Sequence, residues 1–134
     1  MSPAYFVMSG NVKLAVYTWG EAVLHKPTLV LVHGYPDSAR IWQGIAQQLA
    51  QYFYVVAYDV RGAGMSYKPT AIKEYDLSLL SADLVVVLDS LPNAQKVHLV
   101  GHDWGGIQSW ESVTDAKIQT RLASFTCISA PCLD

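Results

Sequence analysis

The 134-residue sequence is poor in cysteine and has no long apolar run. Its two cysteines, Cys127 and Cys132, are too few for a disulfide framework, and we expect both as reduced thiols in a cytoplasmic protein. No Cys/His cluster has the spacing of a zinc site, so no metal is expected. No segment approaches the ~18 apolar residues of a membrane-spanning helix, and membrane insertion is not expected. The N-terminus also lacks the basic residues that open a signal peptide.

Positively charged residues are also few. Nine Lys plus Arg stand against 11 Asp plus Glu, for a net charge of −2, and no basic run is present, which argues against nucleic-acid binding. Hydrophobic residues make up 51% of the chain and charged residues 15%, which excludes a disordered chain. The length permits one domain with a true hydrophobic core.

Strand-like and helix-like patterns alternate along the chain. Residues 5–19 are typical of a hairpin that turns at Ser9-Gly10-Asn11. Four later apolar runs lack alternation, as strands covered on both faces do: 28–32, 54–58, 97–100 and 122–128. Helical spacing follows three of these runs: after Ser38 with Ile41, Trp42, Ile45 and Leu49 on one face, from Leu77 to Leu91 before Pro92, and after Gly106. This order predicts an α/β fold with a mostly parallel sheet, an N-terminal antiparallel hairpin and helices on both faces.

The strand predicted at 122–128 has no helix after it that could cover it. It would form an exposed apolar edge, which natural sheets avoid. The pattern therefore predicts that these residues are the N-terminal part of a larger domain.

One motif indicates a catalytic function. It is Gly101-His102-Asp103-Trp104-Gly105-Gly106, and it lies between a predicted strand and a predicted helix. This is the context of a nucleophile elbow, with Asp103 at the position of the nucleophile. Glycines permit the tight turn, and the helix N-terminus keeps a carboxylate ionised. A carboxylate can attack an alkyl carbon and form an ester. The alternative is an ordinary glycine-rich turn with a capping aspartate, which we disfavour because the motif arises by chance in roughly one such chain in several hundred.

The motifs together resemble the epoxide hydrolase and haloalkane dehalogenase group of the α/β-hydrolase fold family. The segment 33–37, His-Gly-Tyr-Pro-Asp, resembles the oxyanion loop of that group, and 59–66 resembles its Asp-x-Arg-Gly-x-Gly-x-Ser loop. The resemblance implies that Asp103 is the nucleophile, that backbone N–H groups of Tyr35 and Trp104 form the oxyanion hole, and that no cofactor is needed. The remaining motif residues are expected to shape the two loops: His33, Gly34, Pro36, Gly101, His102, Gly105 and Gly106.

Tyr35 bears on the substrate, because haloalkane dehalogenases commonly carry Asn at this position, whereas epoxide hydrolases typically carry an aromatic residue. Fluoroacetate dehalogenases carry Arg at the position of Trp104. The resemblance therefore implies a small apolar epoxide as substrate. Two alternatives stay open: a haloalkane dehalogenase, and a truncated chain that catalyses nothing.

The family's catalytic histidine, its acid and the tyrosines of its cap domain have no counterpart in these residues. Residues 1–134 are therefore expected to be a partial core domain that ends after the strand following the nucleophile helix and before the cap, and to be inactive alone. None of His25, His33, His98 and His102 is expected to replace the base, and Asp134 is more simply a chain end than an acid. The tail from residue 128 also resembles hydrolase domains fused to a short-chain dehydrogenase.

Overall fold

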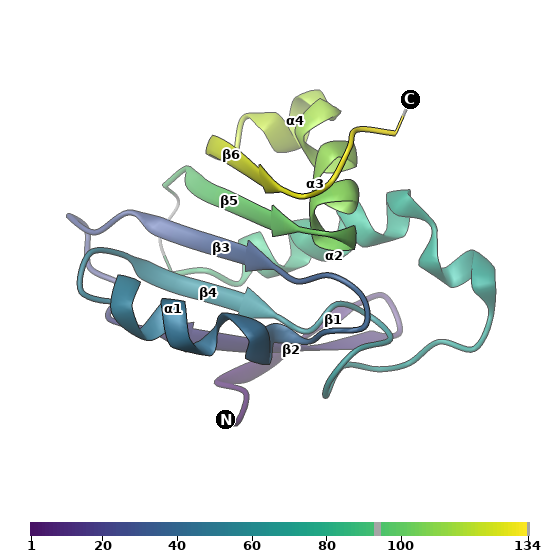
Figure 1. Cartoon of the computed structure of the whole chain (residues 1–134), viewed down its shortest axis with the longest axis horizontal. Coiled ribbons are helices and arrows are strands. Elements are labelled where there is room, and N and C mark those ends of the chain that lie inside the picture. The colour runs from purple at the N-terminus through teal and green to yellow at the C-terminus, as the bar shows by residue number, and fades with distance from the viewer. Residues whose placement is uncertain (93–94, 134) are drawn as a thin grey trace.

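The computed structural model describes residues 1–92 and 95–133, which form a six-stranded mixed sheet with helices on both faces (Figure 1). The strands are β1 (Tyr5–Ser9), β2 (Val12–Trp19), β3 (Thr28–Val32), β4 (Tyr54–Tyr58), β5 (Val97–His102) and β6 (Leu122–Ile128). The helices are η1 (Ala39–Trp42), α1 (Gln43–Leu49), η2 (Ile72–Tyr75), α2 (Leu77–Asp89), α3 (Trp104–Thr114) and α4 (Ala116–Gln119), of which η1 and η2 are 3-10 helices. The predicted fold class is confirmed.

The strand order is β1-β2-β4-β3-β5-β6. The first two pairs, β1–β2 and β2–β4, are antiparallel, and the other three are parallel. Gly10 makes the hairpin turn with φ +57°, a backbone conformation that glycine adopts without cost. The parallel strands β3, β4 and β5 therefore end at one edge of the sheet, where the loops that follow them meet.

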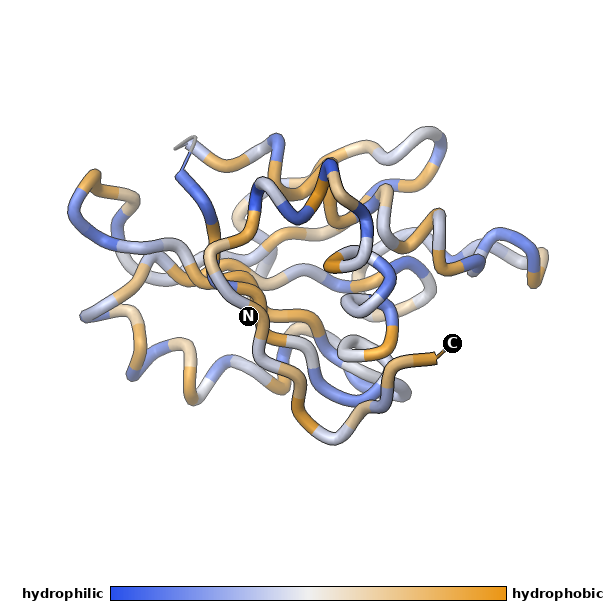
Figure 2. The backbone as a smooth tube through the Cα atoms, turned by 90° about the horizontal axis from the view of Figure 1, so that it is seen from above, coloured by the Kyte–Doolittle hydropathy of each residue, from blue (hydrophilic) through white to orange (hydrophobic). Residues whose placement is uncertain are grey.

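Two apolar layers sandwich the sheet. One lies under α2 and includes Val30, Val56, Leu84 and Leu99, all almost fully buried. The other lies under η1 and α1. Figure 2 shows hydrophobic segments running together through the middle of the molecule, whereas the outer turns alternate between hydrophilic and hydrophobic residues. Each fully buried Val or Leu side chain stabilises the fold by about 1.5–3 kcal/mol, so these layers hold the loop-bearing edge rigidly.

The apolar face predicted for the helix after Ser38 is partly wrong. Ser38 caps the helix as predicted, but Ile41 and Ile45 are 48% and 50% exposed. The segment begins as a 3-10 helix, whose 120° per residue rotates the faces relative to an α-helix. Trp42 is buried as predicted and Leu49 packs against the same core, and the other buried positions are Ala39 and Ala46.

Strand β6 forms one end of the sheet and pairs only with β5 among the described residues. Its side chains on one face, such as Phe125, pack toward α3, while Ala123, Ser124, Thr126 and Ile128 are exposed. The predicted exposed edge is present.

Candidate active site

Asp103 occupies the turn between β5 and α3 with φ 56° and ψ −129°. A positive φ is unusual for a non-glycine residue, and such strain is typical of a functional turn. The neighbouring glycines make the turn possible, because no side chain fits there. A Cβ on Gly101 would lie 2.6 Å from the carbonyl oxygen of Gly105, and one on Gly106 would lie 2.9 Å from Cys127 Sγ.

The loop after β3 brings Tyr35 to this carboxylate, 68 residues away in sequence. The backbone N–H of Tyr35 donates to Asp103 Oδ2 at 3.0 Å, and Gly34 has no space for a Cβ beside the same carboxylate. The peptide bond between Tyr35 and Pro36 is cis. The structure therefore brings together the residues predicted for the nucleophile and one oxyanion donor.

Two backbone N–H groups favour the ionised form of Asp103. The pKa of this carboxyl lies below its ordinary value because the N–H of Trp104, and then that of Tyr35, hydrogen-bond it. Trp104 is the first residue of α3, so the positive end of the helix dipole acts in the same direction. Asp103 is thus a carboxylate at neutral pH, with Oδ2 already held by a donor.

His33 holds the loop after β3 against the loop after β4. The N–H of Val60 donates to His33 Nε2 at 3.0 Å, so Nδ1 carries the proton and donates to the carbonyl oxygen of Gly34 at 2.8 Å. Burial lowers the pKa of His33, which agrees with a neutral ring. Both ring nitrogens are therefore engaged by the backbone.

No histidine of the described ranges hydrogen-bonds Asp103. The ring of His102 lies edge-on to Trp42, with centroids 6.5 Å apart. His98 bonds Ser124 Oγ at 2.7 Å on the sheet face, and His25 is exposed in the loop before β3. Asp134 lies outside the described residues, so its suggested role is not placed.

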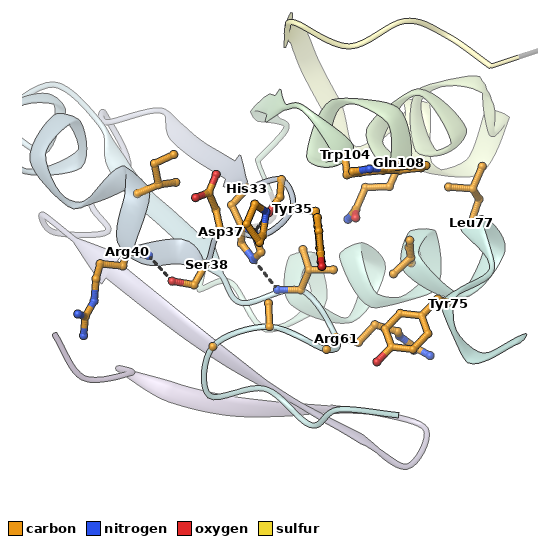
Figure 3. Close-up of a pocket in the computed structure, with 18 of the residues that line it drawn as sticks. His33, Tyr35, Asp37, Ser38, Arg40, Arg61, Tyr75, Leu77, Trp104 and Gln108 are labelled. Carbon is orange, nitrogen blue, oxygen red and sulfur yellow. Dashed lines mark hydrogen bonds between the residues drawn. The ribbon is translucent and has the colours of Figure 1, made fainter. Parts of the chain in front are cut away.

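A cavity of about 1190 Å³ opens beside this turn (Figure 3). Three segments, 33–38, 60–64 and 75–77, form most of its lining, and Arg40, Ile41, Leu80, Trp104 and Gln108 complete it. Asp103 itself is not a lining residue, but the flanking Tyr35 and Trp104 are, and they are 79% and 51% exposed. An apolar molecule in this space would contact both rings close to the carboxylate.

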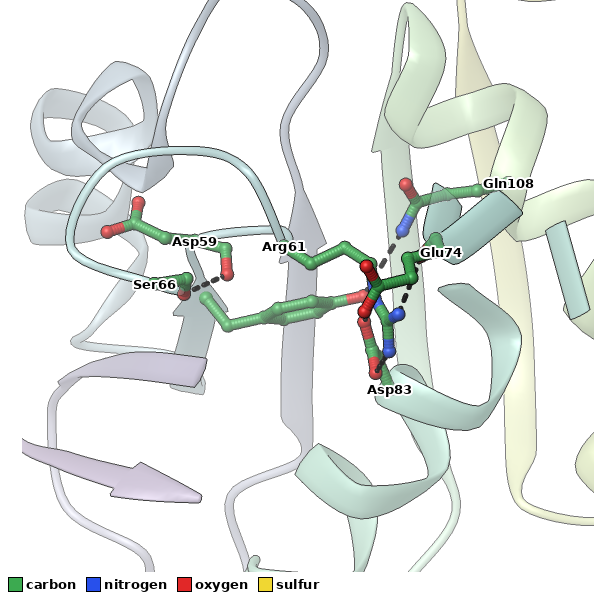
Figure 4. Close-up of polar contacts among 7 residues, drawn as sticks. Asp59, Arg61, Ser66, Glu74, Asp83 and Gln108 are labelled. Carbon is green, nitrogen blue, oxygen red and sulfur yellow. Dashed lines mark hydrogen bonds and ion pairs between the residues drawn. The ribbon is translucent and has the colours of Figure 1, made fainter. Parts of the chain in front are cut away.

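A buried ion pair fixes the far wall of the cavity (Figure 4). Arg61 donates from Nε to Asp83 Oδ2 at 2.7 Å and from Nη2 to Oδ1 at 2.6 Å. Its Nη1 donates to the carbonyl oxygen of Glu74 at 2.6 Å. The hydrogen bonds to Asp83 raise the pKa of Arg61. This pair attaches the loop after β4 to α2, and sequence reasoning missed it, although an aspartate among the leucines of the predicted helix was a signal.

Across residues 1–92 and 95–133, no cluster of three or more metal-ligating side chains occurs, and no helix is long and apolar enough to span a membrane.

Comparison with known proteins identifies the family of this chain. Residues 27–134 match the family model described as the alpha/beta hydrolase fold. The chain is 40% identical over 124 residues to "Probable oxidoreductase EphD" of Mycobacterium tuberculosis. This alignment covers 92% of this chain and 21% of that protein. It is 37% identical over 128 residues to Epoxide hydrolase A of the same species, covering 95% of this chain and 38% of that protein.

The solved structures that resemble this chain also include epoxide hydrolases. An epoxide hydrolase from Vigna radiata superposes with a TM-score of 0.85 at 30% identity, over 96% of this chain and 40% of that one. Epoxide Hydrolase A from Mycobacterium thermoresistibile gives 0.83 at 34% identity, over 95% and 39%. The chain thus spans well under half the length of the relatives it matches. With the family model matched over most of its length, it belongs to the α/β-hydrolase fold family.

Proposed function

We propose that this chain carries the nucleophile of an epoxide hydrolase, and that Asp103 opens a small apolar epoxide. The observation that supports this most strongly is the hydrogen bond from the Tyr35 N–H to Asp103 Oδ2. It occupies one carboxylate oxygen and leaves Oδ1 as the attacking atom.

In the first step, Oδ1 forms a bond to an epoxide carbon while the bond between that carbon and the epoxide oxygen breaks. The released alkoxide takes a proton from a donor or from water, and an alkyl ester of Asp103 results. Strain in the epoxide ring drives the step, and the apolar cavity favours a substrate without charge.

In the second step, water attacks Cγ of the ester and negative charge develops on Oδ2. We expect the Tyr35 N–H, which donates to Oδ2, and the Trp104 N–H, which also bonds this carboxylate, to stabilise the oxyanion. The tetrahedral species then collapses, releases the diol and restores the carboxylate. Activation of the water requires a general base, which contributes about 10²–10⁴-fold. Since no described histidine hydrogen-bonds Asp103, we expect the ester to persist in this chain.

The proposal is tested by incubating the chain with excess styrene oxide and measuring intact mass, followed by peptide mapping. We expect a low yield of a one-to-one adduct on Asp103. Asp103→Asn should abolish it, whereas Asp37→Asn, which removes another carboxylate at the cavity, should not. An adduct that forms equally in Asp103→Asn would refute the nucleophile.

A chlorinated alkane discriminates the haloalkane dehalogenase alternative, because it would give an ester at Asp103 with release of chloride. We expect the epoxide to react and the chloroalkane not to, since Tyr35 offers no side-chain amide to hold a departing halide. Reaction with neither would favour the non-catalytic fragment.

A further inference from the structure

Asp59 is a buried carboxylate that the proposed reaction does not use. It directly follows β4 and is 1% exposed. Its Oδ1 accepts the Ala39 N–H at 2.8 Å, and its Oδ2 accepts the Tyr17 hydroxyl at 2.8 Å and the Met65 N–H at 2.9 Å. No salt bridge involves it among the described residues, so three neutral donors replace its hydration.

One of these three donors lies at the end of the oxyanion loop. Ala39 is the first residue of η1, and the loop of residues 34–38 runs into it through an extended Ser38 (φ −145°, ψ 177°). The other end of the loop is held by His33, whose Nε2 accepts the Val60 N–H at 3.0 Å. Two consecutive residues, Asp59 and Val60, therefore hold both ends of the loop that presents the Tyr35 N–H.

Asp59 is itself fixed from several directions. Ser66 donates its hydroxyl to the Asp59 carbonyl oxygen at 2.5 Å (Figure 4). The same hydroxyl oxygen accepts the Ala15 N–H at 2.9 Å. A Cβ on Gly64 would overlap the Asp59 carboxylate, so the following loop closes tightly over it. A carboxylate with this little freedom can hold the Ala39 N–H in one place.

We propose that Asp59 is a positioning residue of the site: by binding the Ala39 N–H, it sets where the Tyr35 N–H meets Asp103. The inference rests on the proposed function, in which that N–H stabilises charge on Asp103 Oδ2. It assigns Asp59 no contact with substrate.

The test compares Asp59→Asn with Tyr17→Phe by NMR titration of the Asp103 carboxyl carbon. The asparagine side chain keeps one acceptor oxygen, but its NH₂ group replaces the other and faces a group that is itself a donor. The loop should therefore shift, and the pKa of Asp103 should rise. Loss of the Asp59 charge would by itself lower that pKa, so the expected change has the opposite sign. Tyr17→Phe removes a donor from the same carboxylate without touching the loop, and it should leave the pKa unchanged.

An Asp103 pKa that stays constant or falls in a folded Asp59→Asn variant would overturn the proposal. An equal rise in Tyr17→Phe would also overturn it, because general loosening would then suffice.

A second variant acts from the other partner and keeps Asp59. Ala39→Pro removes the N–H and adds ring carbons at a buried position, but proline is tolerated at the first helical position and after an extended residue. We expect the same rise in the Asp103 pKa. Its absence in the folded variant would overturn the proposal even where Asp59→Asn fails to fold.

A reaction readout separates this proposal from the proposed function. On chains already carrying the styrene oxide ester, hydroxide cleavage at a fixed alkaline pH should be about tenfold slower in Asp59→Asn, because an oxyanion donor is misplaced. Tyr17→Phe should cleave at the wild-type rate. If wild type forms no ester, the proposed function fails, while the pKa comparison still decides the role of Asp59.

Discussion

Gly34 lies against the Asp103 carboxylate so closely that a methyl group would overlap it. Gly34→Ala should therefore fold but displace the carboxylate or the Tyr35 N–H, and adduct formation should fall by up to about 10²-fold. The measurement is the intact-mass rate with styrene oxide.

The matched control is Gly44→Ala in α1, where nothing lies within 4 Å of the new Cβ. That variant should react at the wild-type rate and gain about 0.5–1 kcal/mol in the free energy of unfolding, because alanine favours a helix. Equal reaction rates for the two variants would contradict the close approach at Gly34.

His33 is a second residue-scale test, since burial lowers its pKa from 6.5. Below pH 6.5 the His33 ring binds a proton in the unfolded chain but stays neutral in the folded chain. The free energy of unfolding therefore falls as the pH decreases from 7 toward 5. One proton gives a slope of at most about 1.4 kcal/mol per pH unit. Urea unfolding across this range should show a shallower slope for His33→Gln.

His25→Gln provides the comparison, because His25 is exposed. Its slope should match that of wild type. A wild-type slope that His33→Gln leaves intact would show that His33 does not resist protonation.

At the scale of elements, a buried ion pair attaches a loop to a helix. The two ion pairs among the described residues differ sharply in how far their side chains are exposed. The pair Arg61–Asp83 is buried, with side chains 4% and 1% exposed, and it joins the loop after β4 to α2. The pair Arg121–Asp89 is open, at 41% and 62%.

Asp83→Ala should cost about 3–5 kcal/mol in the free energy of unfolding, because it leaves a buried guanidinium without its partner. Asp89→Ala should cost only about 0–1 kcal/mol. Urea denaturation measures both, and similar losses would mean that Arg61 regains solvent when its partner is removed.

The sequence predicted elements well where local pattern decides them. The unalternated runs became β3 and β4, buried along their whole length, and Gly10 made the expected hairpin. Ile41 and Ile45 were misplaced because the choice between a 3-10 and an α start depends on tertiary packing. The pairing of Asp59 with Ala39 and of Asp83 with Arg61 was not predicted, because the partners lie 20 and 22 residues apart in the sequence and only the fold brings them together.

At the scale of the whole molecule, the open edge at β6 is the feature that we expect to control association in solution. The strand has seven residues and no charged side chain, and among the described residues it pairs on one side only. Exposed uncharged edges recruit further strands. We expect the chain to self-associate in sedimentation velocity at micromolar concentrations.

Thr126→Lys places a charge on the exposed face of this strand and should shift the population toward monomer. Thr120→Lys adds the same charge after α4 and should not. A monodisperse wild-type monomer, or equal effects of both variants, would contradict association through β6.

Heavy-oxygen labelling tests the central claim most directly, namely that Asp103 forms an alkyl ester that is cleaved by attack on its Cγ. The chain is first esterified with styrene oxide, and the ester is then cleaved once in heavy-oxygen water at alkaline pH. Peptide mapping should find the heavy oxygen in the Asp103 carboxylate, and the released diol should lack it. Label found only in the diol, with none in Asp103, would mean that water attacks the substrate carbon directly, and the claim would be wrong.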